Sequence, residues 1–138
     1  MFVINDIELL ERLNKHRILT YLVQRCTISV AGIRVSDYSL RIRQLIQALT
    51  EIKILHVEKA GFDEWATFRR KHLSISDLST IYVAFSNKDA ILVLSPEDQL
   101  LINEAKRNGV GCLLFDEFFV KIIKDEKLIQ LYNLIKAA

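Results

Sequence analysis

Five carboxylates are the residues best placed to carry chemistry in this sequence: Asp6, Asp37, Asp77, Glu97 and Asp98. Asp6 directly follows the short predicted strand 2–5, and Glu97 and Asp98 follow the unbroken apolar run 90–94. The other two lie at or near predicted helix starts. Functional sites of open parallel sheets form outside the carboxyl ends of the strands. We therefore expect these carboxylates at one edge of a sheet.

Carboxylates gathered at one place repel each other, which raises the pKa of some of them and costs stability. A divalent cation relieves that repulsion, and Mg²⁺ and Mn²⁺ prefer oxygen ligands. The reaction most often supported by such a site is hydrolysis of a phosphodiester, in which the metal activates a water and neutralises phosphate charge. The acids therefore indicate a hydrolytic metal site.

The elements that must position these acids alternate along the chain. The predicted strands are 2–5, 27–30, 52–57, 90–94 and 111–115. Helical spacing of apolar residues predicts helices at 9–13, 18–23, 36–50, 65–68, 78–85, 96–108 and 118–135. Strand–helix alternation predicts a doubly wound α/β fold, with a mostly parallel five-stranded sheet and helices on both faces. The 138 residues contain no linker or repeat, so we expect a single domain over 1–138.

Two of the helix starts have the form of a capping box. Ser74 precedes Asp77, and Ser95 precedes Asp98, each by three positions, with Pro96 suited to a first helical position. Both aspartates thus have a structural explanation as well as a functional one. The same holds for acids in a first helical turn, such as Glu97, which the helix dipole favours.

Two other acids have different local settings. Asp63 is the predicted N-cap of the helix that carries Trp65 and Phe68. Asp6 ends a buried strand, which is costly unless the carboxylate faces a site or a hydrogen-bonding loop. A functional role is therefore favoured for Asp6.

Several short motifs occur in a fixed order: Val3-Ile4-Asn5-Asp6, Leu73-Ser74-Ile75-Ser76-Asp77 with Ala84, Ile91 to Leu100, and Ala105 with Gly109-Val110. This order resembles the PIN-domain family, in which an L-S-x-x-D helix start precedes a strand ending in T-x-D-x-x-L and then an A-x-x-x-G-V segment. The resemblance covers roughly residues 2–125.

The resemblance implies an Mg²⁺- or Mn²⁺-dependent ribonuclease, similar in small stand-alone members to the toxin of a toxin–antitoxin pair. Its acidic quartet would be Asp6, Asp37, Asp77 and Glu97. Asp6 and Asp77 would bind metal directly, and the other two would do so directly or through water. Asp98 competes with Glu97 as the fourth acid. RNA, an antitoxin and a second copy of the chain would be the partners.

Departures from the family pattern support a second hypothesis. Ile7 and Glu8 follow the first aspartate where the family usually has Thr or Ser and then Asn or Ser, and Ala31 stands where proline is usual. These changes suit a degenerate PIN-like domain that serves as a protein- or RNA-interaction module.

Two other nucleotide-related classes fit less well. A receiver domain needs an aspartate after its third strand and a lysine after its fifth, whereas His56 and Asp116 stand there. A Rossmann enzyme needs a glycine-rich turn after its first strand, and none is present.

Basic residues provide candidate RNA contacts in a chain of formal net charge +2. They are Arg41, Arg69, Arg70 and Lys71, although a solvated helix end is the commoner explanation of such runs.

The compartment is expected to be the cytoplasm. Acids at positions 6 and 8 do not suit a signal peptide, and no apolar run approaches the roughly 18 residues that a membrane span needs. Cys26 and Cys112 are expected to be separate, reduced thiols.

Overall fold

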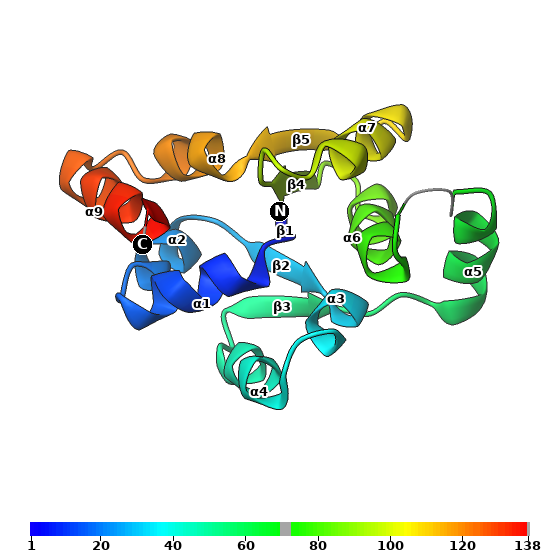
Figure 1. Cartoon of the computed structure of the whole chain (residues 1–138), viewed down its shortest axis with the longest axis horizontal. Helices are drawn as coiled ribbons and strands as arrows, with labels where there is room; N and C mark the ends of the chain where they lie inside the picture. Colours follow the sequence, from blue (N-terminus) through cyan, green and yellow to red (C-terminus); the bar gives the residue numbers. More distant parts are fainter. Residues whose placement is uncertain (70–72, 138) are drawn as a thin grey trace.

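The protein contains one five-stranded sheet, seen in a computed structural model that describes residues 1–69 and 73–137 (Figure 1). The strands are β1 (Phe2–Ile4), β2 (Ile28–Ala31), β3 (Ile52–Leu55), β4 (Ile91–Leu94) and β5 (Gly111–Leu114). Their order is β3-β2-β1-β4-β5, and every neighbouring pair is parallel. The predicted doubly wound α/β fold is confirmed, with a fully parallel sheet.

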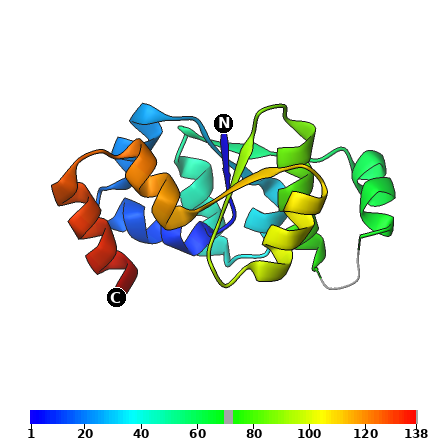
Figure 2. The ribbon, with the colours of Figure 1, turned by 90° about the horizontal axis from the view of Figure 1, so that it is seen from above.

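Helices cover both faces of this sheet. They are α1 (Ile7–Lys15), α2 (Leu19–Arg25), α3 (Gly32–Ser36), α4 (Leu40–Ala48), α5 (Lys59–Thr67), α6 (Ile75–Ser86), α7 (Gln99–Arg107), α8 (Phe115–Ile122) and α9 (Glu126–Ala137). Helices α1, α2, α8 and α9 share one hydrophobic core with the sheet, and α6 and α7 share the other. Figure 1 shows these two groups on opposite sides of the strands, and Figure 2 shows α5 standing outside α6.

The strands contribute to both cores because their side chains alternate. Val3 faces the α6–α7 core, and the next residue, Ile4, faces the α1–α9 core. In β4, Leu92 and Leu94 face the α6–α7 core, and Val93 faces the α1–α9 core. A strand buried on both faces reads as an unbroken apolar run, which explains why residues 90–94 carry no polar residue.

The predicted helix over 36–50 is wrong in its start. Helix α3 ends at Ser36, and α4 begins after Ser39, whose hydroxyl accepts a hydrogen bond from the Ile42 N–H at 3.4 Å. A serine that caps the next helix interrupts a pattern whose apolar spacing runs across the break. Asp37 consequently lies at the C-terminal end of α3 and not at a helix start.

Two other predicted helix starts need correction. Helix α5 begins at Lys59, four residues before the expected N-cap Asp63, because Glu58 accepts a hydrogen bond from the Gly61 N–H at 2.8 Å. Helix α7 begins at Gln99, because the residues from 95 to 98 form a turn instead of its first helical turn.

The capping prediction at α6 is confirmed in its first half. The Ser74 hydroxyl accepts a hydrogen bond from the Asp77 N–H at 3.0 Å. The predicted end of α7 near Asn108 and Gly109 is also confirmed. Asn108 is the C-cap, and Gly109 has a φ of 74°, a left-handed conformation that favours glycine.

The chain changes direction across the sheet at β1. It passes from β1 outward to β2 and β3, and then crosses to β4 and β5 on the other side. A crevice outside the carboxyl ends of β1 and β4 is therefore the place where this topology favours a site.

Candidate functional site

Asn5 lies at the centre of this edge, directly after β1. It is only 2% exposed, and its Nδ2 donates a hydrogen bond to Asp98 Oδ2 at 3.4 Å. Its Oδ1 is buried, with no hydrogen-bond partner among the described residues. Buried polar atoms are normally paired, so an unpaired amide oxygen at the switch point marks a place where a donor or cation could be accommodated.

Arg34, on α3, connects the end of β1 to the start of α6. Its Nε donates to the Asn5 carbonyl oxygen at 3.2 Å, and its Nη1 lies 3.3 Å from Ser76 Oγ and 3.4 Å from Asp77 Oδ1. The guanidinium also lies 5.8 Å from the centre of the Tyr38 ring. Arginine is suited to such multiple bonding because its donors are spread over a rigid plane. The Asp77 carboxylate therefore has a positive partner within the chain.

The neighbouring acids Glu97 and Asp98 differ in burial and in hydrogen-bond partners. Asp98 Oδ2 accepts from the Ser95 N–H at 3.2 Å as well as from Asn5, and its side chain is half-buried. Glu97 is exposed and accepts from Ser95 Oγ at 2.6 Å. That hydrogen bond lowers the pKa of Glu97 below its ordinary value. Of the two candidates for the fourth acid, Asp98 is the one that contacts Asn5.

Asp6 follows Asn5 and is the N-cap of α1. Its Oδ1 accepts a hydrogen bond from the Leu9 N–H at 3.0 Å, which satisfies one of the unpaired donors at the helix start. The side chain is only half-buried. The cap is a structural reason for an aspartate at the end of a buried strand, and it lies beside the Asn5–Asp98 contact.

In the part of the chain that the structure describes, the predicted acidic quartet forms no single metal-binding group. Asp77 and Asp98 reach the edge around Asn5, while Asp37 and Glu97 are exposed to solvent. Within residues 1–69 and 73–137, no three or more His, Cys, Asp or Glu side chains are grouped so that they could hold a metal ion. The described residues around Asn5 thus give no support to the four-acid metal site that the resemblance implies, which stays a prediction.

A second polar group, formed by Asp116, Tyr132 and Lys136, lies after β5 and is not among the predicted site residues. The Tyr132 hydroxyl donates to Asp116 Oδ1 at 2.5 Å, and Lys136 Nζ lies 2.9 Å from Asp116 Oδ2. Burial by itself would raise the pKa of Asp116, but these two hydrogen bonds outweigh it and lower the pKa. Burial, together with the bond to Asp116, raises the pKa of Tyr132. The group ties α9 to the start of α8.

Sequence reasoning missed the two residues that organise the edge. Arg34 is not among the candidate basic residues, and Asn5 enters only as part of the motif that ends at Asp6. A polar residue directly before a strand-ending aspartate, followed about thirty residues later by an arginine in a short helix, is the signal that was available.

The basic candidates have different settings. Arg41 is exposed and ion-paired with Glu11. Arg69 is half-buried, whereas Arg70 and Lys71 lie outside the described residues. Both cysteines are free thiols, and burial raises the pKa of each.

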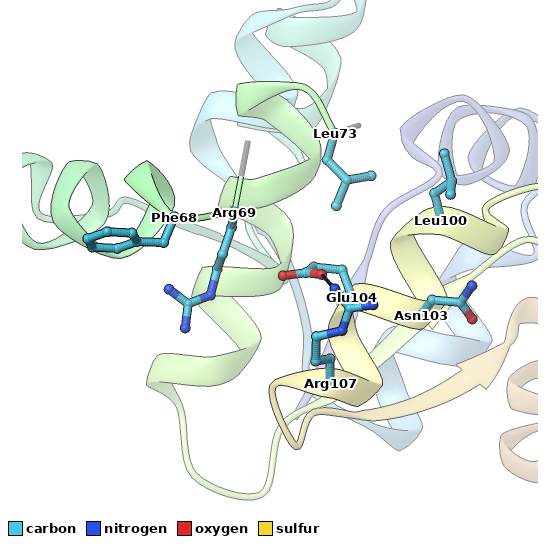
Figure 3. A pocket seen from close by; sticks show the side chains of 7 residues that line it. All are labelled: Phe68, Arg69, Leu73, Leu100, Asn103, Glu104 and Arg107. Carbon is cyan, nitrogen blue, oxygen red and sulfur yellow. Dashed lines mark hydrogen bonds and ion pairs between the residues drawn. The ribbon is translucent and has the colours of Figure 1, made fainter. Parts of the chain in front are cut away.

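A hollow of about 350 Å³ lies away from the edge, between the end of α5 and helix α7. It is lined by Phe68, Arg69, Leu73, Leu100, Asn103, Glu104 and Arg107. Figure 3 shows Phe68 on one side of this hollow and Leu73 and Leu100 on the other, with Glu104 and Arg107 between them.

Comparisons of the chain with known protein families, with characterised proteins and with solved structures gave no match. Among the helices that the structure describes, none is long and apolar enough to cross a membrane.

Proposed function

We propose that this chain is a degenerate PIN-like domain that binds its partner without hydrolysing it, and that Arg34 takes the place of a metal ion at its carboxylate edge. The observation that carries the proposal is the Arg34 network. One guanidinium contacts the Asn5 carbonyl, the Ser76 hydroxyl and the Asp77 carboxylate.

The charges at the edge support this proposal. In an acidic metal site, the cation offsets the repulsion among carboxylates. Here the guanidinium supplies a positive charge 3.4 Å from Asp77, and Asp98 is bonded to neutral donors, the Asn5 amide and the Ser95 N–H. Each of these two acids thus has a partner that belongs to the chain itself.

Calorimetric titration of Mn²⁺ tests the proposal, with Arg34→Gln beside the wild type and Arg25→Gln as the matched control. Arg25 is an exposed arginine whose hydrogen bond among the described residues is to the Tyr21 carbonyl in its own helix. We expect no binding at millimolar Mn²⁺ and no RNA cleavage for the wild type and the control. Arg34→Gln should acquire measurable Mn²⁺ binding, because it exposes Asp77 without its counter-charge. Wild-type protein that binds Mn²⁺ and cleaves RNA would overturn the proposal.

A second candidate function is the Mg²⁺- or Mn²⁺-dependent ribonuclease, with an antitoxin and a second copy as partners. The unpaired Asn5 Oδ1, together with Asp98 and the adjacent Asp6, favours it, since Mg²⁺ is commonly held by one or two carboxylates plus other oxygens and water. This candidate requires that Asp6→Asn and Asp98→Asn each abolish a cleavage activity of the wild type, while Asp37→Asn leaves it intact.

A further inference from the structure

We propose that the hollow between α5 and α7 binds single-stranded RNA, with one base stacked on Phe68 and the phosphates beside Arg69 and Arg107. This inference rests on the proposed function as a binding domain and names its partner and surface. It concerns a part of the molecule that shares no residue with the Asn5 edge.

Phe68 is the most exposed large apolar side chain that the structure describes, at 83%. It lies at the C-cap of α5, while the neighbouring aromatic residues Trp65, Tyr82 and Phe85 pack against one another. A phenyl ring left in water at the rim of a hollow is available for stacking, and every base offers a flat face to such a ring.

Arg69 holds a charge at a fixed position beside that ring. Its Nε donates to Asn108 Oδ1 at 3.0 Å, its Nη1 to the Trp65 carbonyl at 2.5 Å, and its guanidinium lies 4.4 Å from the centre of the Trp65 ring. These partners are neutral, so they orient the guanidinium without cancelling its charge. A fixed cation loses little entropy when a phosphate binds.

Arg107 supplies the second cation. Its side chain is 77% exposed, and its Nη1 lies 3.1 Å from Glu104 Oε2. The Glu104 side chain is only 13% exposed, so the pair anchors Arg107 from below and leaves most of its guanidinium toward solvent. A guanidinium has five N–H donors and most of this one faces solvent, so Arg107 can bind a phosphate while its pair with Glu104 stays in place.

The mixed lining favours a nucleotide over an apolar helix. The lining includes an aromatic ring, two guanidinium groups, the Asn103 amide and the Glu104 carboxylate that pairs with Arg107, whereas an apolar helix would need a continuous apolar floor. The exposed Leu100 adds an apolar contact across from Phe68. An exposed aromatic ring in a basic groove is the arrangement by which proteins hold single strands.

Fluorescence anisotropy with a labelled 12-nucleotide mixed-sequence RNA, in EDTA so that no metal-dependent cleavage interferes, tests the inference. We expect Phe68→Ala to weaken binding about ten-fold and Phe68→Trp to retain it, since stacking depends on the ring. Arg107→Gln should weaken binding and lower the slope of log affinity against log salt by about 0.7. Leu134→Ala and Arg25→Gln are the matched controls, because both positions are exposed on other helices.

The outcomes separate this inference from the proposed function. Equal RNA affinity of Phe68→Ala and wild type, no RNA binding by the wild type, or a preference for duplex RNA or single-stranded DNA would each overturn the inference, while the Mn²⁺ titration would be unaffected. Conversely, Mn²⁺-dependent cleavage would overturn the proposed function and leave a Phe68-dependent affinity in EDTA in place.

Discussion

Two arginine–carboxylate pairs of similar geometry behave differently in this molecule. Arg34 lies 3.4 Å from Asp77 and Arg107 lies 3.1 Å from Glu104, yet their side chains are 23% and 77% exposed. The first pair also bonds the backbone carbonyl of a buried residue, Asn5, and so links β1 with α6. The comparison teaches that burial and shared partners, and not the pair distance, decide whether an arginine holds the fold or remains available to a ligand.

The largest expected effect is the loss of the partly buried Arg34–Asp77 pair. Arg34→Met should lower the free energy of unfolding by about 2 kcal/mol, because it leaves the Asn5 carbonyl without its donor and Asp77 without its counter-charge. Urea unfolding followed by circular dichroism measures the change. Arg107→Met is the matched control, expected to stay within about 0.5 kcal/mol of wild type. Equal destabilisation of the two variants would break the comparison.

The next effect concerns the group after β5. Tyr132→Phe should lower the free energy of unfolding by about 1.5 kcal/mol, since the buried hydroxyl bonds a carboxylate. The pKa of Tyr132 is raised above its ordinary value of 10.0, so its contribution is complete below that pH and is lost as pH rises above it. The pKa of Asp116 is lowered below 3.8, so its contribution is complete above that pH and is lost as pH falls below it.

These directions predict a pH profile. Wild-type stability, measured by urea unfolding, should decline above pH 10, and Tyr132→Phe should decline less there. Stability at acid pH should also fall less in Asp116→Asn than in wild type. Parallel profiles of wild type and Tyr132→Phe above pH 10 would show that another group is responsible.

A smaller effect is expected at the cap that places Asp77. Ser74→Ala should lower the melting temperature with a loss of about 1 kcal/mol, because the Asp77 N–H at the start of α6 loses its acceptor. Ser36→Ala is the control, since Ser36 is exposed and its hydroxyl donates to the Ile33 carbonyl at the end of α3. A loss at Ser36 as large as that at Ser74 would contradict the cap.

The smallest effect is predicted for the hollow. Phe68→Ala should leave the free energy of unfolding within about 0.5 kcal/mol of wild type, because the ring is almost fully in solvent. Thermal unfolding checks this value. A loss above about 2 kcal/mol would mean that Phe68 packs against the body, and it would remove the reason for assigning the ring to a ligand.

Local patterns predicted an element well where an unbroken apolar run or a single capping residue decides it. The apolar run 90–94 contains β4, and Ser74 caps α6 as its sequence suggested. Local patterns gave wrong helix starts where a serine has a role that the apolar spacing does not reveal. Apolar spacing over 36–50 gives no sign that Ser39 begins a new helix, and the Ser95–Asp98 spacing forms a turn although it has the form of a capping box.

The candidate site was predicted only in outline. Hydrogen bonds join Asp98 to Asn5 and Asp77 to Arg34 at the Asn5 edge, and Asp6 directly follows Asn5 in the chain. Asp37 lies at an exposed helix end because of the break before α4. The ribonuclease activity, the metal, the RNA and antitoxin partners and the cytoplasmic location stay predictions.

The sequence by itself determined the strands, most helices and the sheet edge at which polar residues collect, because periodicity and capping are local properties. Only the tertiary structure decided that Arg34 would stand among the acids. The contacts that place it and Asn5 join residues 29, 43 and 93 positions apart. Such contacts depend on how the helices pack on the two faces of the sheet, and no local pattern encodes that packing.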